Sequence, residues 1–362
     1  MNQHFDIPCD AFALKGNVLS VEPHGFGHIN RTWKVTTDAG AAYLFQRVNT
    51  EIFPNMDGLM RNIRMVTEHV GRKITAEGGS VMRQTMNVVP ALDGRDYVRT
   101  ADGCYRVYVF IEDTTALQSP RSEEDMYETA KAFGGFQKQL ADFPAEQLAE
   151  VIPNFHNTPK RLETLFRAAE EDTMGRAKEV RAELEFIRER QAFAACLEQG
   201  IASGSLPLRV AHNDTKLNNL LFDKTSMKPI SVVDLDTVMP GTSLYDFGDG
   251  IRFGASTAAE DEKALEKVHC DMTLYAAFTR GWLEACGESM TEGEKRLLPM
   301  SPRVLTMECG ARFLTDYLQG DVYFHTTRPG QNLDRCRTQL KLVREMEEHE
   351  EEMIRIAREC VR

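Results

Sequence analysis

The sequence predicts an α+β protein with two lobes, in which a small antiparallel sheet is followed by a larger, mainly helical region. Three observations support this prediction. Short β-type runs separated by turn residues fill the first part of the chain, helical periodicity replaces them after Glu112, and 362 residues are enough for two packed lobes. We expect the first lobe to cover residues 1–112 and the second to cover residues 113–362.

The first lobe begins with three predicted strands. A Gly-rich turn, His24 to His28, separates the first two, and Asp38-Ala39-Gly40 supplies turn residues before the third. Such short connections join antiparallel neighbours, so we expect a meander. The predicted strands are Val18 to Glu22, Ile29 to Thr37 and Ala42 to Val48.

An amphipathic helix and two more strands complete the predicted first lobe. Between Pro54 and Lys73, apolar residues recur at spacings of three and four, which is the stripe of a helix that lies on a sheet. These residues are Leu59, Ile63, Val66 and Val70. The two further strands are expected at Val88 to Leu92 and at Tyr105 to Ile111.

The second lobe is predicted to be mostly helical. Ser122 with Asp125 is typical of a capped helix start, and Met126, Ala130 and Phe133 follow on one face. A charged helical stretch is expected from Lys160 to about Gln199, and helices resume from Thr257. Between these helices, residues 207 to 249 form short apolar runs broken by polar residues.

Composition and charge exclude several classes of protein. The formal net charge is −12, and no Lys/Arg-rich run interrupts it, so a nucleic acid is not expected as a partner. No stretch approaches the roughly 18 apolar residues that span a bilayer, and the N-terminus lacks a basic region followed by an apolar one. We therefore expect a soluble, cytoplasmic protein that is not bound to a membrane.

The segment HNDTKLNN, residues 212 to 219, contains groups that phosphoryl transfer requires. That reaction needs a base for the attacking hydroxyl, cations on the phosphates and oxygen ligands for those cations. Asp214 is followed five residues later by Asn219, the spacing of a kinase catalytic loop. Asp214 is the predicted base, Asn219 a predicted Mg²⁺ ligand, and Lys216 is placed to put a positive charge on the transferred group.

A second acidic motif follows this segment. Leu220 to Phe222 and Ile230 to Val233 are expected to pair as short strands, and Asp234 emerges at the end of the second one. This position suits a magnesium ligand. Asp236 lies two residues further on an extended chain, so the two carboxylates could share one or two Mg²⁺ ions, or Asp234 alone could bind.

Two further residues near these motifs are expected to be structural. His212 is predicted to be a packed, hydrogen-bonded support of the loop. Asp246 is predicted to hold the loop by accepting backbone N–H bonds. The string Asp246-Phe247-Gly248 resembles a kinase metal motif, but no strand is expected before it and it lies too far downstream.

The Gly-rich turn is a candidate phosphate-binding loop. Gly25, Phe26, Gly27 and His28 lie between two predicted strands, and glycine lets backbone N–H groups approach phosphate oxygens closely. Asn30 stands where a protein-kinase loop has its third glycine. Taken alone, this segment is an ordinary hairpin more often than a phosphate loop.

In these motifs the sequence resembles the aminoglycoside phosphotransferase and choline kinase superfamily, and within it the N-acetylhexosamine 1-kinases. Residues 212–219 and 232–253 carry the specific part of the resemblance. Weaker matches cover residues 25–35, 44–49, 106–113 and 312–321. The resemblance implies a protein-kinase-like fold, with a nucleotide-binding first lobe and a second lobe that carries the catalytic residues and the acceptor site.

The resemblance also implies a reaction: an ATP- and Mg²⁺-dependent transfer of phosphate to the anomeric hydroxyl of GlcNAc or GalNAc. It assigns Asp214 as the base, Asn219 and Asp234 as metal ligands, and residues of the C-terminal helices as sugar contacts. The implied nucleotide contacts are Gly25, Phe26, Gly27, His28, Asn30, Phe110 and Glu112. The implied sugar contacts are Arg312, Asp316 and Tyr317.

Kinases usually place a basic residue on the third strand, but here Gln46 and Arg47 are adjacent and point to opposite faces. Arg47 is favoured by its charge, although the strand register could select Gln46. Other acceptors, namely choline, an aminoglycoside or another sugar, remain open. So does a non-catalytic nucleotide-binding module, although such a protein commonly lacks one of the residues found here.

Overall fold

The computed structural model describes residues 7–25 and 29–360. The chain divides into two compact units. The first unit consists of residues 1–116, 147–152 and 221–238, and the second of residues 117–146, 153–220 and 239–362. The expected boundary after Glu112 lies near Ala116, but two later segments also belong to the first unit.

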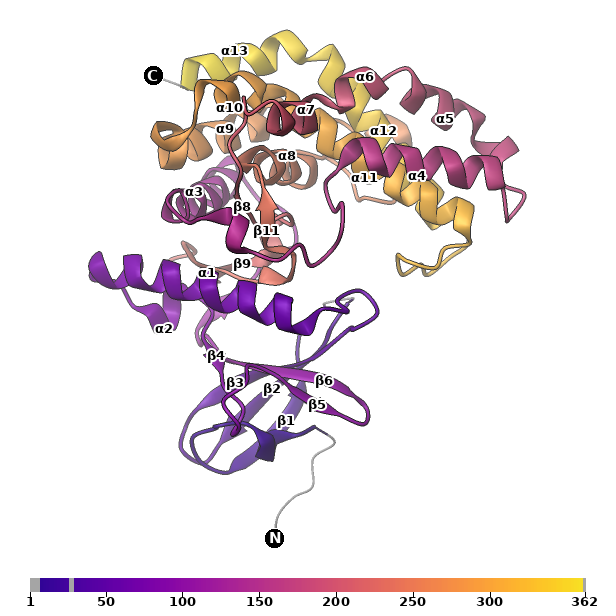
Figure 1. Ribbon diagram of the computed structural model, residues 1–362. Coiled ribbons are helices and arrows are strands. Elements are labelled where there is room, and N and C mark those ends of the chain that lie inside the picture. Colours follow the sequence, from indigo (N-terminus) through magenta and orange to yellow (C-terminus); the bar gives the residue numbers. More distant parts are fainter. Residues whose placement is uncertain (1–6, 26–28, 361–362) are drawn as a thin grey trace. The chain divides into compact units, whose positions relative to one another are not determined.

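The first unit is built on a six-stranded antiparallel sheet in the order β1-β2-β3-β6-β4, with β5 also paired to β6 (Figure 1). The expected meander of the first three strands is confirmed. The strands are β1 (Val18–Pro23), β2 (Arg31–Thr37), β3 (Ala42–Val48), β4 (Val88–Val89), β5 (Val98–Thr100) and β6 (Gly103–Val109).

Turn and cap residues set the limits of these elements. Gly40 has φ +73° in the turn between β2 and β3, a conformation that glycine adopts without strain. The predicted strand from Val88 to Leu92 is reduced to two paired residues, because Pro90 has no N–H group to donate to the ladder. The helix α1 (Met56–Ala76) starts after Asn55, whose side chain accepts a hydrogen bond from the Gly58 N–H.

A second, three-stranded sheet in the first unit has the order β10-β9-β7. Its strands are β7 (Thr114–Thr115), β9 (Leu220–Asp223), whose first residue belongs to the second unit, and β10 (Pro229–Val232). The predicted hairpin formed by residues 220–222 and 230–233 is therefore present, with its second strand starting one residue earlier. The short helix α2 (Val81–Gln84) completes this unit.

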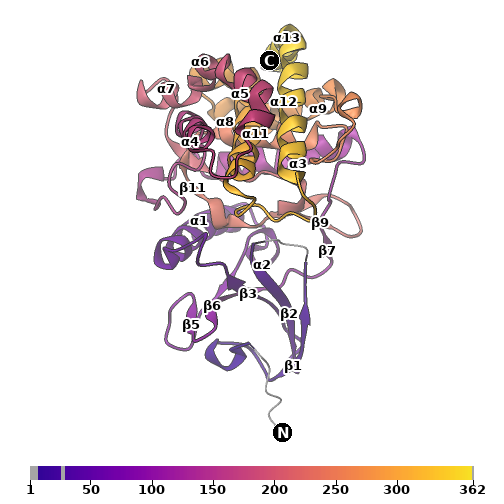
Figure 2. The same cartoon turned by 90° about the vertical axis from the view of Figure 1, so that its right-hand side faces the viewer.

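The second unit is mainly helical, as predicted (Figure 2). Its helices are α3 (Glu123–Gln139), α4 (Thr158–Glu171), α5 (Arg181–Arg188), α6 (Gln191–Ala194), α7 (Cys196–Ala202), α8 (Ser243–Gly254), α9 (Met272–Cys286), α10 (Glu292–Leu297), α11 (Ser301–Gln319), α12 (Gln331–Glu348) and α13 (Glu350–Cys360). A two-stranded antiparallel ladder pairs β8 (Arg209–Ala211) with β11 (Met239–Gly241).

Two expectations for the second unit are corrected. Helical structure resumes at Ser243 rather than at Thr257, because Thr242 caps α8. Among the described residues, no regular α-helix follows α8 until Asp271 caps α9.

The Asp246-Phe247-Gly248 string lies inside α8, and the short strand β11 does precede it. A helical Asp cannot be the strand-end metal ligand of a kinase, so the functional conclusion about this string stands.

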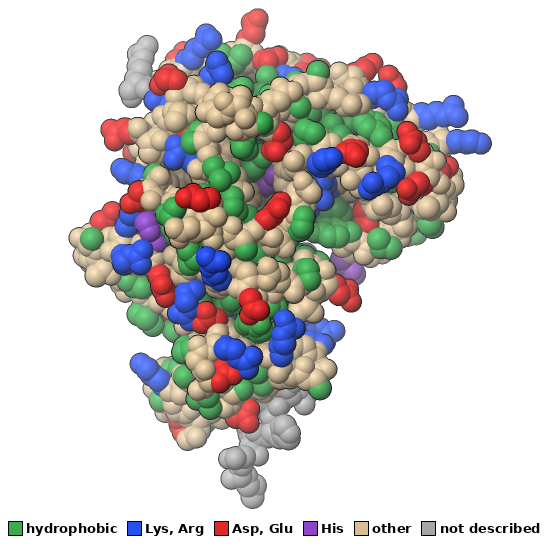
Figure 3. All heavy atoms as spheres, in the orientation of Figure 1, with side chains coloured by type: hydrophobic (Ala, Val, Ile, Leu, Met, Phe, Trp, Pro, Cys, Tyr) green, Lys and Arg blue, Asp and Glu red, His purple; other side chains and the backbone are tan. Residues whose placement is uncertain are grey.

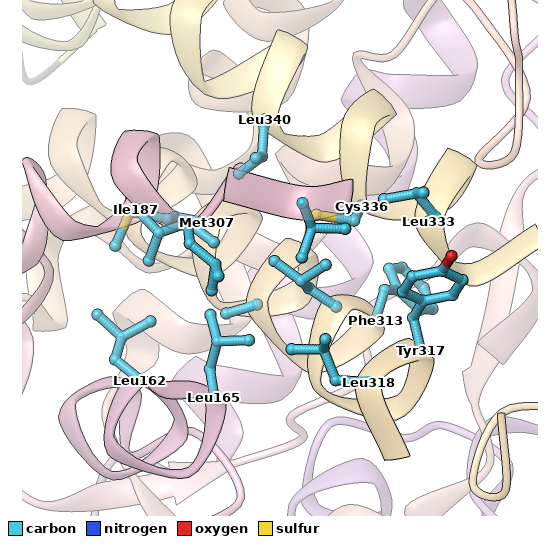
Figure 4. Packing of buried hydrophobic residues seen from close by; sticks show 14 of the residues in the cluster. Leu162, Leu165, Ile187, Met307, Phe313, Tyr317, Leu318, Leu333, Cys336 and Leu340 are labelled. Atoms are coloured by element: carbon cyan, nitrogen blue, oxygen red, sulfur yellow. The ribbon is translucent and has the colours of Figure 1, made fainter. Parts of the chain in front are cut away.

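A hydrophobic cluster fills the space between α4, α5, α11 and α12 (Figure 4). Leu165 and Ile187 are fully buried in it, together with Leu314 and Cys336. Burying each large side chain contributes roughly 1.5–3 kcal/mol. This packing holds α11, the helix that carries the implied sugar contacts.

The surface has a mixed charge distribution. On the face drawn in Figure 3, Lys and Arg side chains are interspersed with Asp and Glu side chains. With a net charge of −12, such a surface gives little attraction for a phosphodiester backbone. Within residues 7–25 and 29–360, no helix combines the length and the apolar composition that a membrane crossing requires.

The buried carboxylate of Glu294 links three elements of the second unit. It accepts hydrogen bonds from Arg209 of β8 at 2.6 and 2.8 Å, from the Ser243 hydroxyl at 2.6 Å and from the Thr291 N–H at 2.8 Å. Burial raises the pKa of Glu294, but these donors outweigh burial and hold its pKa below the ordinary value of 4.5.

We predict that Glu294→Gln destabilises the protein by about 3 kcal/mol at pH 7, because Arg209 loses its charged partner in a buried site. A carboxyl group with a lowered pKa stabilises the fold above its ordinary pKa, and this contribution is lost as pH falls through the folded pKa. The difference in unfolding free energy between the variant and wild type, measured by urea unfolding, should therefore become smaller below about pH 4.

The matched control is Glu292→Gln, on the same helix, because the side chain of Glu292 is 92% exposed. This variant should unfold like wild type at both pH values. A Glu294→Gln variant with wild-type stability at pH 7 would contradict the assigned role of the buried carboxylate.

Candidate active site

The predicted catalytic loop follows β8 and is held by a buried carboxylate. Asp246 accepts hydrogen bonds from the backbone N–H of His212 at 2.9 Å and of Asn213 at 2.8 Å. Gln137 of α3 donates to the same carboxylate at 2.6 Å. Asn213 has φ +67°, a left-handed conformation that needs such support. The structural role predicted for Asp246 is confirmed.

The side chain of His212 packs beneath this loop. It is fully buried, its ring lies edge-on to Phe133 at 5.5 Å and to Phe136 at 6.1 Å, and its Nδ1 accepts from the Asp214 N–H at 3.3 Å. These contacts match the support role predicted for His212.

Three predicted residues meet at the Asp214 carboxylate. Lys216 Nζ lies 2.8 Å from Oδ1, and Asn219 Nδ2 donates to Oδ2 at 2.8 Å and to the Asp214 carbonyl at 2.9 Å. The Asp214 side chain is 27% exposed, so a ligand can reach it. Burial raises the pKa of Asp214, but Lys216, His212 and Asn219 together lower it to about 2. Asp214 is therefore a carboxylate at neutral pH and can accept a hydrogen bond from a hydroxyl group.

A second anchor of the loop was missed by the sequence analysis. Thr215 is fully buried; its N–H donates to Asp249 at 2.9 Å and its hydroxyl to the Asp246 carbonyl at 2.6 Å. Arg252 binds the other oxygen of Asp249 at 2.8 Å. A signal did exist, because Asp246 and Asp249 are three residues apart and therefore share one face of α8.

A third anchor comes from distant parts of the chain. His156 Nδ1 lies 2.7 Å from the Glu308 carboxylate, and its Nε2 lies 3.1 Å from the Asn213 carbonyl. The Thr158 hydroxyl donates to the same carboxylate at 2.8 Å. Both imidazole nitrogens therefore contact oxygen atoms, one of which belongs to the predicted catalytic loop. No local sequence pattern predicts contacts among residues 156, 213 and 308.

In the first unit, the predicted metal residues have different surroundings. Asp234 has φ 59° and ψ 57° and precedes a short 3-10 turn, Leu235–Thr237. Asp236 lies in that turn, and its carboxylate is paired with Arg106 and accepts a hydrogen bond from Asn30 at 2.8 Å. The two carboxylates therefore do not have equivalent environments.

The third-strand positions are resolved by the sheet register. Gln46 lies opposite Arg106, and Arg47 lies opposite Tyr105. Tyr105 belongs to a core cluster with Tyr43 and Phe45, which share the face of Arg47. The structure therefore brings Gln46, and not the favoured Arg47, to the side of the sheet that carries Arg106 and Asp236.

The candidate phosphate loop is described in part. Gly25 has φ +79°, and Phe26, Gly27 and His28 lie outside the described residues. The Asn30 side chain donates to Asp236 and accepts from the Asn49 N–H at 3.0 Å. Asn30 therefore connects the end of this loop to the turn that follows Asp234.

The implied adenine hinge follows β6. The Phe110 N–H donates to the Ala42 carbonyl at 3.0 Å, and Lys34 Nζ lies 4.1 Å from the centroid of the Phe110 ring. Lys34 also pairs with Glu112 at 3.1 Å, and the Glu112 carbonyl accepts from Arg83 at 3.1 Å. Phe110 and Glu112 are thus held by neighbours within the first unit.

The three implied sugar contacts on α11 are not equivalent. Asp316 accepts hydrogen bonds from the backbone N–H groups of residues 322, 323 and 324, and it therefore organises the loop after α11. The Tyr317 hydroxyl donates to Glu179 at 3.0 Å, and its ring is part of the core cluster. Arg312 is partly buried, with its guanidinium 4.8 Å from the ring centroid of Phe155.

The described residues contain no group of three or more His, Cys, Asp and Glu side chains that could hold a metal ion. Magnesium does not require such a group, since it is commonly bound by one or two protein oxygen ligands together with phosphate and water. Asn219 fits this chemistry, because donation from its amide nitrogen to Asp214 directs its amide oxygen away from that carboxylate.

We predict that Asp246→Asn impairs both the loop and the fold. The amide can present a donor to N–H groups that need an acceptor, which should cost about 2 kcal/mol of unfolding free energy. Turnover should fall by about 100-fold, because Asp214 follows the two anchored residues directly. Urea unfolding and a steady-state assay measure the two effects. Asp10→Asn, at an exposed position, is the control, and unchanged turnover in Asp246→Asn would refute the anchoring role.

Three solved structures with a similar fold are a kinase, a phosphotransferase and a second kinase. A microcompartment-associated aminopropanol kinase matches with a TM-score of 0.57 and 13% identity, covering 95% of this chain and 96% of its own. An aminoglycoside phosphotransferase from Alicyclobacillus acidocaldarius matches with a TM-score of 0.54 and 16% identity (99% and 97% covered). A choline kinase from Cryptosporidium parvum matches with a TM-score of 0.52 and 15% identity (96% and 93% covered).

These matches show that the fold is protein-kinase-like, with an antiparallel sheet in the first unit and a helical second unit. A family model for phosphotransferase enzymes matches residues 20–286, which is most of the chain and includes the predicted catalytic loop and the acidic motif at Asp234 and Asp236. The chain therefore belongs to the phosphotransferase enzyme family.

Proposed function

We propose that this phosphotransferase is an ATP-dependent sugar kinase that phosphorylates the anomeric hydroxyl of N-acetylhexosamines, GlcNAc or GalNAc. The observation that carries the proposal is the partly exposed Asp214 carboxylate, with Lys216 and Asn219 both 2.8 Å from its oxygens. The acceptor assignment depends on the sequence resemblance to the N-acetylhexosamine 1-kinases.

In the proposed reaction, Asp214 accepts the proton of the anomeric hydroxyl as its oxygen bonds to the γ-phosphorus of ATP. The bond from this phosphorus to the β,γ-bridging oxygen breaks, and ADP leaves with the bond electrons. The lowered pKa of Asp214 keeps it ionised and ready to accept a hydrogen bond, so its main contribution is to orient the hydroxyl. Lys216, beside Asp214, can stabilise negative charge on the transferred group.

Asn219 and Asp234 are the proposed ligands of the magnesium that accompanies ATP. When bound, Mg²⁺ neutralises phosphate charge and aligns the β- and γ-phosphates. Gly25 to Asn30 is the proposed phosphate loop, and Phe110 to Asp113 the proposed adenine hinge. These assignments follow from the match between this sequence and the kinase motifs.

The charges near α11 support a neutral acceptor over a cationic one. The guanidinium groups of Arg312 and Arg161 lie 4.8 and 6.0 Å from the centroid of the same ring, Phe155. Burial, together with the Arg312 charge, lowers the pKa of Arg161, so the two cations repel each other. If the acceptor binds beside α11, as the resemblance implies, a positively charged choline or aminoglycoside would add to this repulsion. A neutral sugar with hydrogen-bond acceptors would not.

The first prediction of this proposal concerns the acceptor. ADP release, coupled to NADH oxidation in the presence of Mg²⁺, should occur with GlcNAc or GalNAc and should stop when EDTA removes the metal. Choline, kanamycin and glucose, tested at equal concentrations, should give rates at least about tenfold lower. Release with an amine acceptor alone would replace this proposal with the corresponding amine or aminoglycoside kinase.

The second prediction concerns the base. Asp214→Asn should lower kcat by about 10³-fold, because the neutral amide lacks the negative charge that orients the hydroxyl and receives its proton. The Kd for ATP should change by less than about threefold, since Asp214 acts on the acceptor hydroxyl. Isothermal titration gives the Kd, and a single-turnover assay gives the rate. Near-normal turnover in this variant would exclude Asp214 as the base.

A further inference from the structure

The first unit contains a buried ion pair that the proposed chemistry does not yet use. Arg106 of β6 and Asp236 are 1% and 5% exposed, with 2.5 Å between Nη1 and Oδ1 and 2.8 Å between Nη2 and Oδ2. Removing two charges from water is costly unless the geometry is good and the remaining polar atoms find partners. A pair this deeply buried therefore needs supporting hydrogen bonds.

Two amide side chains supply that support. Gln46 Oε1 accepts from Arg106 Nε at 3.0 Å and from Nη2 at 2.8 Å. Asn30 Nδ2 donates to Asp236 Oδ2 at 2.8 Å, while its own oxygen accepts from the Asn49 N–H. Asn30, Gln46, Arg106 and Asp236 are called the Arg106 cluster below. It connects β3, β6 and the end of the candidate phosphate loop.

The sheet register explains why the positive charge comes from β6. Gln46 occupies the third-strand position that faces the cluster, and it is neutral. Arg47 carries a charge but shares the opposite face with Phe45. The cation that faces Asp236 is therefore Arg106, one strand further along the sheet than in the usual kinase arrangement.

The cluster fixes one end of the turn that begins at Asp234. Asp236 is held by Arg106 and Asn30, and the Val238 carbonyl accepts from the buried Asn62 of α1 at 2.9 Å. Asp234 itself has a left-handed backbone conformation, which persists only where the surroundings impose it. The position of the Asp234 carboxylate therefore depends on contacts made two and four residues later.

We propose that Arg106 is a positioning residue for Mg·ATP, which holds the Asp234 turn through Asp236 and replaces the missing basic residue of the third strand. The inference depends on the proposed function only in taking Mg·ATP as the ligand, and it is independent of the sugar acceptor. In this arrangement Asp236 serves as the partner of Arg106 and not as a metal ligand.

The experiment must separate positioning from simple stabilisation. Arg106→Met leaves Asp236 buried without its cation, so its Tm should fall by several degrees. The double variant Arg106→Met/Asp236→Asn contains no buried charge at this point and should recover most of that Tm. Its affinity for Mg·ATP, measured by isothermal titration of the full-length protein, should nevertheless remain at least about tenfold weaker than in wild type.

A charge-relocation variant tests the geometric part of the proposal. Gln46→Lys/Arg106→Gln moves the cation to the third strand, opposite its original position, and should bind Mg·ATP more tightly than Arg106→Gln alone, by about tenfold. The same comparison with ATP and EDTA should show a smaller difference, because the proposed effect acts through the metal ligand. Arg99→Met, an exposed arginine on β5 of the same sheet, is the matched control and should bind like wild type.

Wild-type Mg·ATP affinity in the stable double variant would overturn the proposal and leave Arg106 with a structural role only. Equal affinities of Gln46→Lys/Arg106→Gln and Arg106→Gln would overturn it as well. If the wild-type protein binds Mg·ATP but releases no ADP with any sugar, the acceptor assignment fails and this test remains valid.

Discussion

The candidate active site depends on one buried carboxylate. Asp246 accepts hydrogen bonds from the N–H groups of His212 and Asn213, so Asn213, the residue before Asp214, is held in a left-handed conformation. Asn219 and Lys216 then act on a carboxylate whose backbone is already fixed. The position of Asp214, the proposed base, therefore follows from a constraint placed on the two residues that precede it.

Three other carboxylates are buried and also bind neighbouring side chains. Glu294 is neutralised by Arg209, Glu308 faces His156, and Asp236 pairs with Arg106. Each carboxylate is almost fully buried, and each also accepts a hydrogen bond from a neutral group: Ser243, Thr158 and Asn30 respectively. Buried charges are tolerated only with such partners, so each of these sites requires the elements that supply the partners to be in place.

Local sequence patterns predicted many of the strands and helices. The features that they did not predict depend on contacts between residues far apart in the chain. Strand 42–48 was predicted with its observed limits, because alternation and the turn at Gly40 are local signals. The contacts of Asp214 with Lys216 and Asn219 likewise lie within the eight residues that the sequence motif brought together. The choice between Gln46 and Arg47 was not predicted, because it depends on which face of β3 meets a residue 60 positions away. The contact of His156 with Asn213 has no local signal for the same reason.

The two acidic residues of the Asp234 turn illustrate how tertiary contacts decide between equal local alternatives. Spacing alone allows both Asp234 and Asp236 to bind a metal ion. However, Oδ2 of Asp236 accepts hydrogen bonds from Arg106 and Asn30, and Oδ1 lies in ion-pair contact with Arg106 at 2.5 Å. Moving this carboxylate to a metal would leave the Arg106 guanidinium buried without its counter-charge, a change that costs several kcal/mol. The ion pair therefore supports the proposal that Asp234 is the metal ligand of this turn and that Asp236 holds the turn in place.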